Sequence, residues 1–321
     1  MKLKSVLALS AAWCAAIAPL LAQASNWPER SIRVIVPFAA GGNTDGIARL
    51  TAERLTQSLG QSVVVENRPG ANGSIAAQAV QRADPDGYTL LMAAMPIIAI
   101  LPKVQKVPYD PVKDFVPISN IGSNPFALGI GKNVPATNLK EFVELVRKSP
   151  GRYNYASGGS GSVSHLSGAL FLKRTGLEMM HVMYKGDAPA MAAVLGGEVS
   201  MYFGNLSAIA PQAKAGNVRM LAVSSSRPTP LFPDVPAIAD TYPGFETLTW
   251  NGLMAPAGTP RAVVNRIADE VRRLGRDSAF VDRLAALGVD VVADGPDELA
   301  ATVQSDIALW TDAVKAADLK E

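Results

Sequence analysis

Short apolar runs and helical patterns alternate along the chain from residue 27 onward. Runs rich in Val and Ile, such as 32–36 and 63–65, read as buried strands. Between them, apolar residues recur every three or four positions from Ala48 to Leu59, which is typical of one buried helix face. Gly60 suits the C-terminal cap of that helix. The alternation predicts an α/β fold with mainly parallel strands.

The same alternation resumes in the middle of the chain. A strand is expected at 126–130 and another at 153–156. Asn138 precedes the intervening helical pattern, with Glu141 three residues later in the manner of a capping box. The strand expected at 248–254 then returns toward the first part of the chain.

This order predicts two α/β lobes joined by two chain crossings. The crossings fall near Asn124 and Trp250. We expect one lobe to comprise 25–124 with 252–321, and the other to comprise 125–251. The helices that follow Pro260 should pack on the first lobe. Two crossings make a hinge rather than a linker.

The amino terminus has the three-part layout of a secretory signal. Lys2 and Lys4 precede an apolar run over 6–21, which is short for a membrane span. Ala22-Gln23-Ala24 supplies the small residues that a signal peptidase accepts. We therefore predict a signal peptide over 1–24, cleavage after Ala24 and export to the periplasm. Cys14, the only cysteine, would be removed with it.

Charge excludes a nucleic-acid partner. The full chain has 30 Lys and Arg against 28 Asp and Glu, and removal of Lys2 and Lys4 leaves 28 of each. A neutral protein of this kind has no electrostatic footprint for nucleic acid or anionic lipid.

Two glycine-rich loops each follow a strand and precede a helix. Their segments are 37–44, with Gly41 and Gly42, and 157–162, with three glycines and three serines. Glycine lets the backbone approach a ligand, and a helix N-terminus holds an anion through unpaired N–H groups. Facing loops of this kind would bind an acid with one or two carboxylates, although each alone could be only a tight turn.

Enzyme signatures are missing. The chain has neither the spacing of a phosphate-binding P-loop nor Gly-x-Ser-x-Gly, and we expect no nucleophile–base pair. The only two histidines are His165, beside the serine-rich loop, and His181, which reads as a core residue. With no mature cysteine and two separated histidines, a zinc site of the usual type is disfavoured. Asp45 either stabilises the first helical turn, fixes its loop or accepts a bond from a ligand.

Motifs spread over the whole mature chain resemble those of one family. They run from Trp27-Pro-Glu-Arg through Pro37-Phe-Ala-Ala-Gly-Gly to Val64–Gly73, and later include Tyr184-Lys-Gly and Ala255–Pro260. The sequence resembles the Bug family, the TctC-like substrate-binding receptors of tripartite tricarboxylate transporters. The resemblance implies a type II periplasmic binding protein, or Venus flytrap, without a cofactor or catalysis.

The resemblance also implies a set of binding residues in both loops. The residues that match, with Asn205 as a further contact, are Phe38, Ala40, Gly41, Gly42, Thr44, Asp45, Ser157, Ser160, Ser162, Ser164, His165 and Asn205. We expect a monomer that passes a small carboxylate to the membrane components of a transporter. A ligand sensor for a signalling partner is compatible with the same sequence, and a secreted hydrolase that uses the same cleft is disfavoured.

Overall fold

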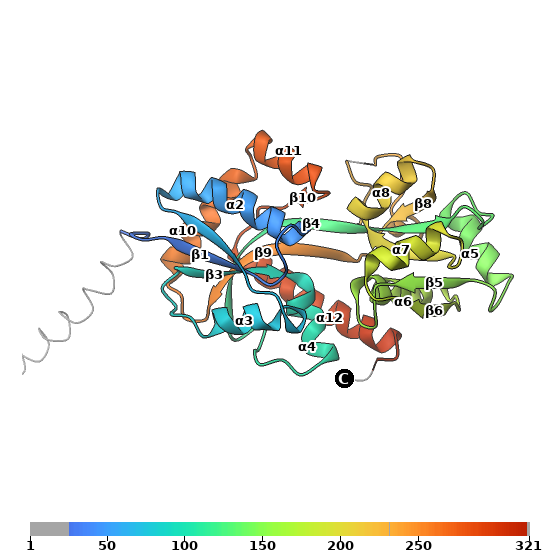
Figure 1. The fold of residues 1–321 in the computed structure, drawn as a ribbon, viewed down its shortest axis with the longest axis horizontal. Helices are drawn as coiled ribbons and strands as arrows, with labels where there is room; N and C mark the ends of the chain where they lie inside the picture. The colour runs from blue at the N-terminus through green and yellow to red at the C-terminus, as the bar shows by residue number, and fades with distance from the viewer. Residues whose placement is uncertain (1–25, 231, 320–321) are drawn as a thin grey trace, which may run out of the picture.

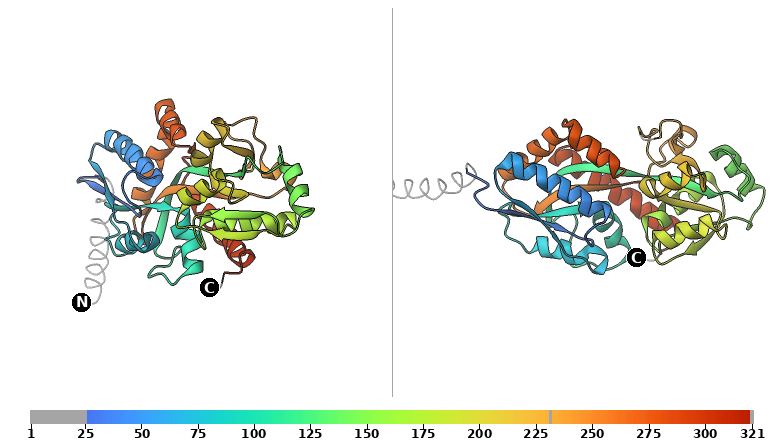
Figure 2. Two further views of the ribbon diagram at one scale, coloured as in Figure 1. Left: turned by 45° about the vertical axis from the view of Figure 1, so that its right-hand side comes forward. Right: turned by 45° about the horizontal axis from the view of Figure 1, so that its top comes forward.

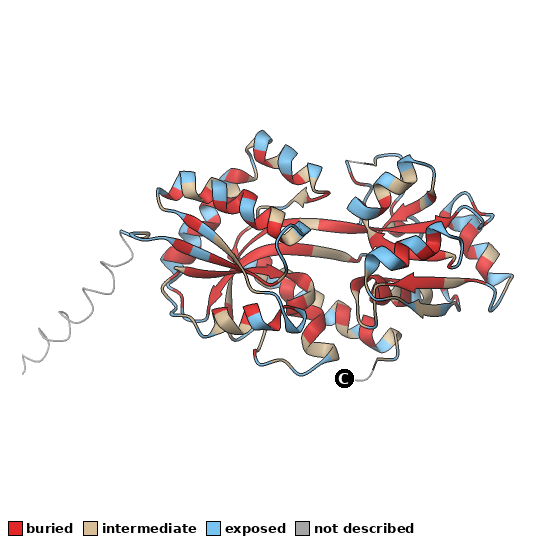
Figure 3. Ribbon diagram, in the orientation of Figure 1, coloured by how far each residue is buried: buried red, intermediate tan, exposed pale blue. Residues whose placement is uncertain are grey.

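The computed structural model describes residues 26–230 and 232–319. Two α/β lobes lie side by side and are joined by long strands (Figure 1), which confirms the predicted fold class. The strands form the buried interior, while helices present exposed faces outward (Figure 3). The predicted signal peptide and its cleavage site lie outside the described residues.

The first lobe is built on a sheet with the order β2-β1-β3-β9-β4, and β10 also pairs with β4. Strand β1 is parallel to β2 and β3. The strands are β1 (Ile32–Val36), β2 (Val63–Asn67), β3 (Thr89–Ala94), β4 (Phe115–Gly131), β9 (Leu248–Pro256) and β10 (Asp290–Val291). The helices of this lobe are α2 (Asn43–Leu59), η1 (Ala71–Gly73), α3 (Ser74–Gln81), η2 (Pro96–Ile100), α4 (Leu101–Val104), α10 (Arg261–Leu274) and α11 (Ser278–Ala286).

The second lobe uses the other end of β4, which pairs with β7 and β8, while β5 lies between β7 and β6. Its further strands are β5 (Asn154–Ser157), β6 (Met180–Met183), β7 (Met201–Asn205) and β8 (Val218–Val223). Its helices are α5 (Leu139–Arg147), α6 (Val163–Thr175), α7 (Asp187–Leu195), α8 (Leu206–Lys214) and α9 (Ile238–Thr241).

Strand β4 crosses between the lobes without a break. Its first part pairs with β9 as far as Pro125, and its last part pairs with β7 from Phe126. The expectation that a strand begins at Phe126 is therefore wrong. The sequence was misleading because Pro117 and Pro125 usually interrupt strands, whereas here the β4–β9 register shifts after Pro117 and again after Asn120. Such bulges let a long strand bend.

The sheets are mixed rather than mainly parallel, which corrects that expectation. Strand β9 runs antiparallel to both β3 and β4, and β4 is antiparallel to β7, β8 and β10. The reason is that β4 and β9 carry the chain in opposite directions between the lobes. Among the described strands, β1 with its neighbours and β5 with its neighbours are the parallel pairs.

Helix α12 (Pro296–Ala316) lies along both lobes (Figure 2). Trp310 is fully buried, in a core cluster that also contains Phe171 of α6 and Ile97 of η2. The expectation that every helix after Pro260 packs on the first lobe alone is thus incomplete. The boundaries at 124 and 252 stay a prediction.

Local patterns are confirmed where the sequence was clear. Ala48 and Leu55 of α2 are buried, and Gly60 ends the helix with φ 72°. Asn138 caps α5 by accepting from Glu141 N at 2.9 Å, but the Glu141 carboxylate accepts from Thr137 N rather than closing the box on Asn138. Within the described residues, no helix has the length and apolarity needed to cross a membrane.

Candidate functional site

Both glycine-rich loops lie where the sequence placed them, between a strand and a helix. The first joins β1 to α2 and the second joins β5 to α6. Strands β1 and β5 point toward the opposite lobe, so α2 and α6 begin on the facing sides (Figure 1). In α/β proteins, ligands bind outside the carboxyl ends of such strands. The topology therefore directs both loops at the space between the lobes.

The first loop is held from below by Asp45, which is 3% exposed. Its Oδ2 accepts from Gly41 N and from Arg49 Nε, both at 2.9 Å, and its Oδ1 accepts from Asn67 Nδ2 at 2.9 Å. Burial opposes ionisation of Asp45, but these bonds outweigh it and lower the pKa of the carboxyl. Asn67 also donates to Phe38 O at 3.1 Å. Asp45 thus fixes the loop conformation.

The upper side of this loop is open. Ala40, Gly41 and Gly42 are exposed and Thr44 is partly exposed. Gly42 is the N-cap of α2, and no side chain among the described residues accepts from the first amides of that helix. A helix of 17 residues therefore presents uncapped N–H donors toward the second lobe.

The serines of the second loop are mostly used inside the loop. Ser162 Oγ donates to Gly159 O at 2.7 Å and also caps α6 by accepting from His165 N. Ser164 Oγ donates to Asp187 Oδ1 at 3.1 Å. These hydroxyls shape the loop, and their contact with a ligand stays a prediction.

Ser157 and Ser160 differ sharply in exposure. Ser157 is fully buried, whereas Ser160 is exposed and its N–H points at Met183 Sδ, 3.2 Å away. Ser160 is therefore the serine of this loop that is best placed to meet a ligand.

The sequence reading missed a third loop, between β6 and α7. Gly186 has φ 110° and precedes α7 with no side-chain cap, so α7 also has free N-terminal amides. Gly186 N donates to Gly158 O and Tyr184 N donates to Ser157 O, both at 3.0 Å. The signal was present, because a strand, Gly186 and an early Pro189 mark a strand-to-helix turn.

Asn205 lies at the end of β7 and caps α8. Its Oδ1 accepts from Ser207 N at 3.1 Å and from Ser207 Oγ at 2.7 Å.

The two lobes approach each other closely at two places. Gly288 of the first lobe lies against Ser207 of the second, since a Cβ added to Gly288 would lie 2.8 Å from Ser207 Cβ. In a second such approach, a Cβ on Gly161 would lie 3.4 Å from Val104 of α4. The lobes thus touch at the second loop and at the start of α8.

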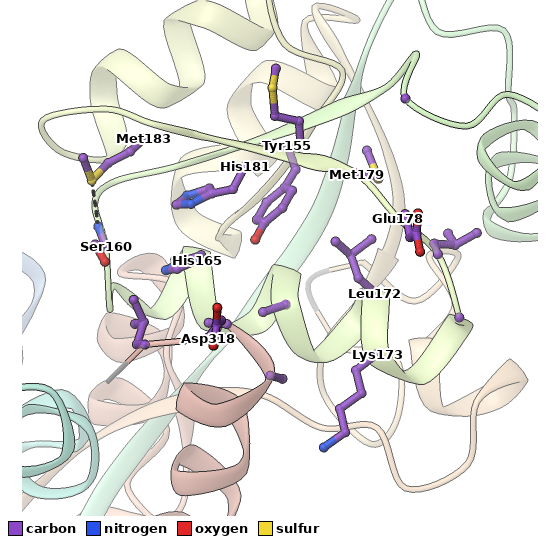
Figure 4. Close-up of a pocket in the computed structure, with 18 residues that line it drawn as sticks. Tyr155, Ser160, His165, Leu172, Lys173, Glu178, Met179, His181, Met183 and Asp318 are labelled. Atoms are coloured by element: carbon purple, nitrogen blue, oxygen red, sulfur yellow. Dashed lines mark hydrogen bonds between the residues drawn. The ribbon is translucent and has the colours of Figure 1, made fainter. Parts of the chain in front are cut away.

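The two histidines lie together although 16 positions separate them. The rings of His165 and His181 are stacked with centroids 3.8 Å apart, and Tyr155 stacks on His181 at 4.9 Å. They line a surface groove of about 920 Å³ between α6, β6 and the end of α12 (Figure 4).

One part of the argument against an enzyme was wrong. Ser157 Oγ and His181 Nε2 lie 2.6 Å apart, so a serine–histidine pair does exist. Because Ser157 is fully buried, its hydroxyl cannot reach a substrate. Within the described residues, no group of three or more His, Cys, Asp or Glu side chains could hold a metal ion.

Residues 47–319 match the model of the tripartite tricarboxylate transporter family receptor. The chain belongs to this family. It is also 34% identical over 317 residues to the BugT protein of Bordetella pertussis, which covers 98% of this chain and 97% of that protein. This membership confirms the resemblance seen in the sequence, and members of the family are periplasmic binding proteins rather than enzymes.

Solved structures agree with this placement. A Rhodopseudomonas palustris protein with adipate is 34% identical, with a TM-score of 0.77, and covers 92% of this chain and 99% of its own. MatC from the same organism, with bound malate, is also 34% identical, with a TM-score of 0.72, and covers 90% of this chain and all of its own. The periplasmic binding protein BugD is 35% identical, with a TM-score of 0.73, and covers 92% and 99%.

Proposed function

We propose that this protein is a periplasmic receptor that binds a small mono- or dicarboxylic acid between its lobes. We further propose that it delivers the acid to the membrane components of a tripartite tricarboxylate transporter. The observation that carries the ligand class is the pair of uncapped helix N-termini, α2 after Gly42 and α7 after Gly186. Two relatives whose structures hold adipate and malate support the same class.

The physical reason lies in the donors. An uncapped N-terminus offers several N–H groups and a partial positive charge, which favour a carboxylate. The loops at 37–42 and 158–162 contain no Arg or Lys, and nearby Arg49 is engaged by Asp45. The turn before α7 does carry a cation, the exposed Lys185 next to Gly186. Recognition by the two glycine-rich loops would rest on fixed backbone geometry rather than on a counter-charge, while Lys185 adds a positive charge at the turn before α7.

The proposed contacts combine both loops with the turn before α7. Exposed backbone at Ala40–Gly42, the Thr44 and Ser160 side chains, and Gly186 are the most accessible parts. Asp45 would act through the shape of its loop. Several other predicted site residues would likewise act by holding the shape of a loop. The residues that remain predicted site residues are Phe38, Ser157, Ser162, Ser164, His165 and Asn205.

Native mass spectrometry of protein purified without denaturation tests the proposal directly. We expect a bound acid whose mass disappears after unfolding and refolding, and whose return restores thermal stability. Binding of a neutral sugar or a polyamine, with no response to any acid, would refute the ligand class. Transport is tested separately by uptake of the same acid with and without the membrane components.

A further inference from the structure

Loop Gly158–Ser162 rests on the stacked histidines at two points. Gly161 N donates to His165 Nδ1 at 3.2 Å, and Ser157 Oγ, at the base of the loop, lies 2.6 Å from His181 Nε2. Gly161 has φ 73°, a left-handed conformation that suits glycine. The labelled rings and the Ser160–Met183 contact are visible together in Figure 4.

These two bonds respond differently to a proton. Because Gly161 donates to His165 Nδ1, that nitrogen must keep its lone pair, and the ring proton must sit on Nε2. If His165 were protonated, its Nδ1–H would face the N–H of Gly161, and the hydrogen bond between them would break. His181 can remain bonded when charged, because its Nε2–H could donate to Ser157 Oγ. His165 is therefore the sensitive member, and a charge on His181 would act on it by repulsion.

We propose that neutral His165 is a positioning residue, which holds loop Gly158–Ser162 in its ligand-binding shape and releases it on protonation. This inference rests on the proposed function, since the loop is part of the proposed site. The loop also meets Val104 of the other lobe through Gly161. Release would therefore weaken both the ligand contact and the contact between the lobes.

The surroundings favour the neutral pair at ordinary pH. Burial, followed by the nearby His181, lowers the pKa of His165 to about 4, and burial lowers that of His181. The titratable and charged groups that line the groove with the pair, or contact it through a neighbour, come from five segments. They are Tyr155 of β5, Lys173 of α6, Glu178 before β6, Asp187 of α7 through Ser164, and Asp318 after α12. None of them makes a hydrogen bond or ion pair with either ring in the described structure, so no carboxylate stabilises the charged form.

Two substitutions form a matched pair. In His165→Asn, Oδ1 takes the place of Nδ1 and can accept from Gly161 but cannot titrate. In His165→Gln, the acceptor lies where Nε2 was, so the loop bond is lost. Calorimetry with adipate and with malate should find Asn within about threefold of wild type at pH 7.5, and Gln about two- to tenfold weaker.

The pH profile separates positioning from mere packing. Between pH 7.5 and 3.5, the wild-type Kd should rise relative to that of His165→Asn by at least about threefold, because His165 is mostly protonated at the lower pH and asparagine cannot be protonated at that position. Comparison at each pH cancels the titration of the acid itself. Parallel profiles for wild type and Asn, or equal binding by Asn and Gln, would overturn the proposal.

Nitrogen-resolved NMR of the two imidazoles tests the inference without a ligand. We expect the His165 proton on Nε2, a pKa well below 6.5, and faster exchange of the Gly161 amide as the ring titrates. A proton on Nδ1 or an ordinary histidine pKa would overturn it. If neither acid binds, the proposed ligand class fails, while this measurement still decides the role of His165.

Discussion

Trp250 Nε1 donates to Asp306 Oδ2 at 2.5 Å and so ties strand β9 to helix α12. Strand β9 carries one of the two crossings between the lobes, and helix α12 packs against both lobes. The carboxyl group of Asp306 is partly buried. This burial, with a smaller contribution from the negative charge of Glu246, raises its pKa to about 6, although the hydrogen bond from Trp250 acts in the opposite direction. A connecting element therefore contains a carboxyl group that titrates at near-neutral pH.

The raised pKa of Asp306 predicts how the free energy of unfolding changes with pH. The folded pKa lies above the unfolded value of 3.8, so between these values the folded state binds more protons, and stability falls as pH rises from about 4 to 6. Asp306→Asn keeps an acceptor for Trp250 without a charge. It should raise the free energy of unfolding at pH 7.5 by about 1–3 kcal/mol and have little effect at pH 3.5.

Urea unfolding at both pH values measures this difference. Asp312→Asn is a suitable control, because Asp312 lies on the same helix but its side chain is 65% exposed. The control should change stability by less than about 0.5 kcal/mol. Equal gains for Asp306→Asn at pH 3.5 and 7.5 would show that its charge is not the cause.

Gly42 offers a clean test of backbone approach in the first loop. Its φ is −79°, and an added Cβ would meet only Ala39 O at 3.7 Å, so Gly42→Val should leave the fold and melting temperature nearly unchanged. We expect binding to fall at least about tenfold, because the side chain would cover the amides of α2.

Gly41→Val serves as the contrasting variant. Gly41 has φ 87°, so this change should cost about 1–2 kcal/mol of stability through backbone strain. Thermal unfolding and calorimetry on both variants separate the two effects. Wild-type affinity in Gly42→Val would leave that glycine with only a turn-forming role.

Sequence predicted the local features well, because they depend on neighbouring residues. The buried face of α2, the cap at Asn138 and the two strand–loop–helix units all follow from spacing within a few positions. The order of strands and helices predicted two lobes with two crossings, and the family motifs added the Venus-flytrap type of fold.

The remaining features depend on residues that are distant along the chain. Strand β4 continues through Pro125 because β9 supplies its partner, 123 positions later at Leu248. The histidine stack needs β6 to lie beside β5, so neither His165 nor His181 revealed it alone. Spacing rules cannot detect such pairs, which only the sheet topology brings together.

Lobe closure is a further expected outcome. The crossings are two paired strands whose register shifts twice, which suits bending at a few residues rather than sliding. A ligand held from both lobes should shift the population toward the compact form. Small-angle scattering should therefore give a smaller radius of gyration at saturating ligand. An unchanged radius at verified saturation would mean that the lobes do not close.

Ligand charge provides the last prediction. Because uncapped amides of α2 and α7 are the proposed donors, the ionised acid should bind, while its methyl ester or amide should not. Each change removes the charge and an acceptor, and a stranded buried donor costs about 1–3 kcal/mol, so the loss should exceed tenfold. Salt should matter little, since the contact is short-range and the mature chain predicted from the sequence is neutral. A calorimetric series of acids, matched esters and amides at two salt concentrations measures both effects. Esters that bind as well as acids would mean that the pocket recognises the carbon skeleton of the ligand, and that the helix N-termini have no part in recognition.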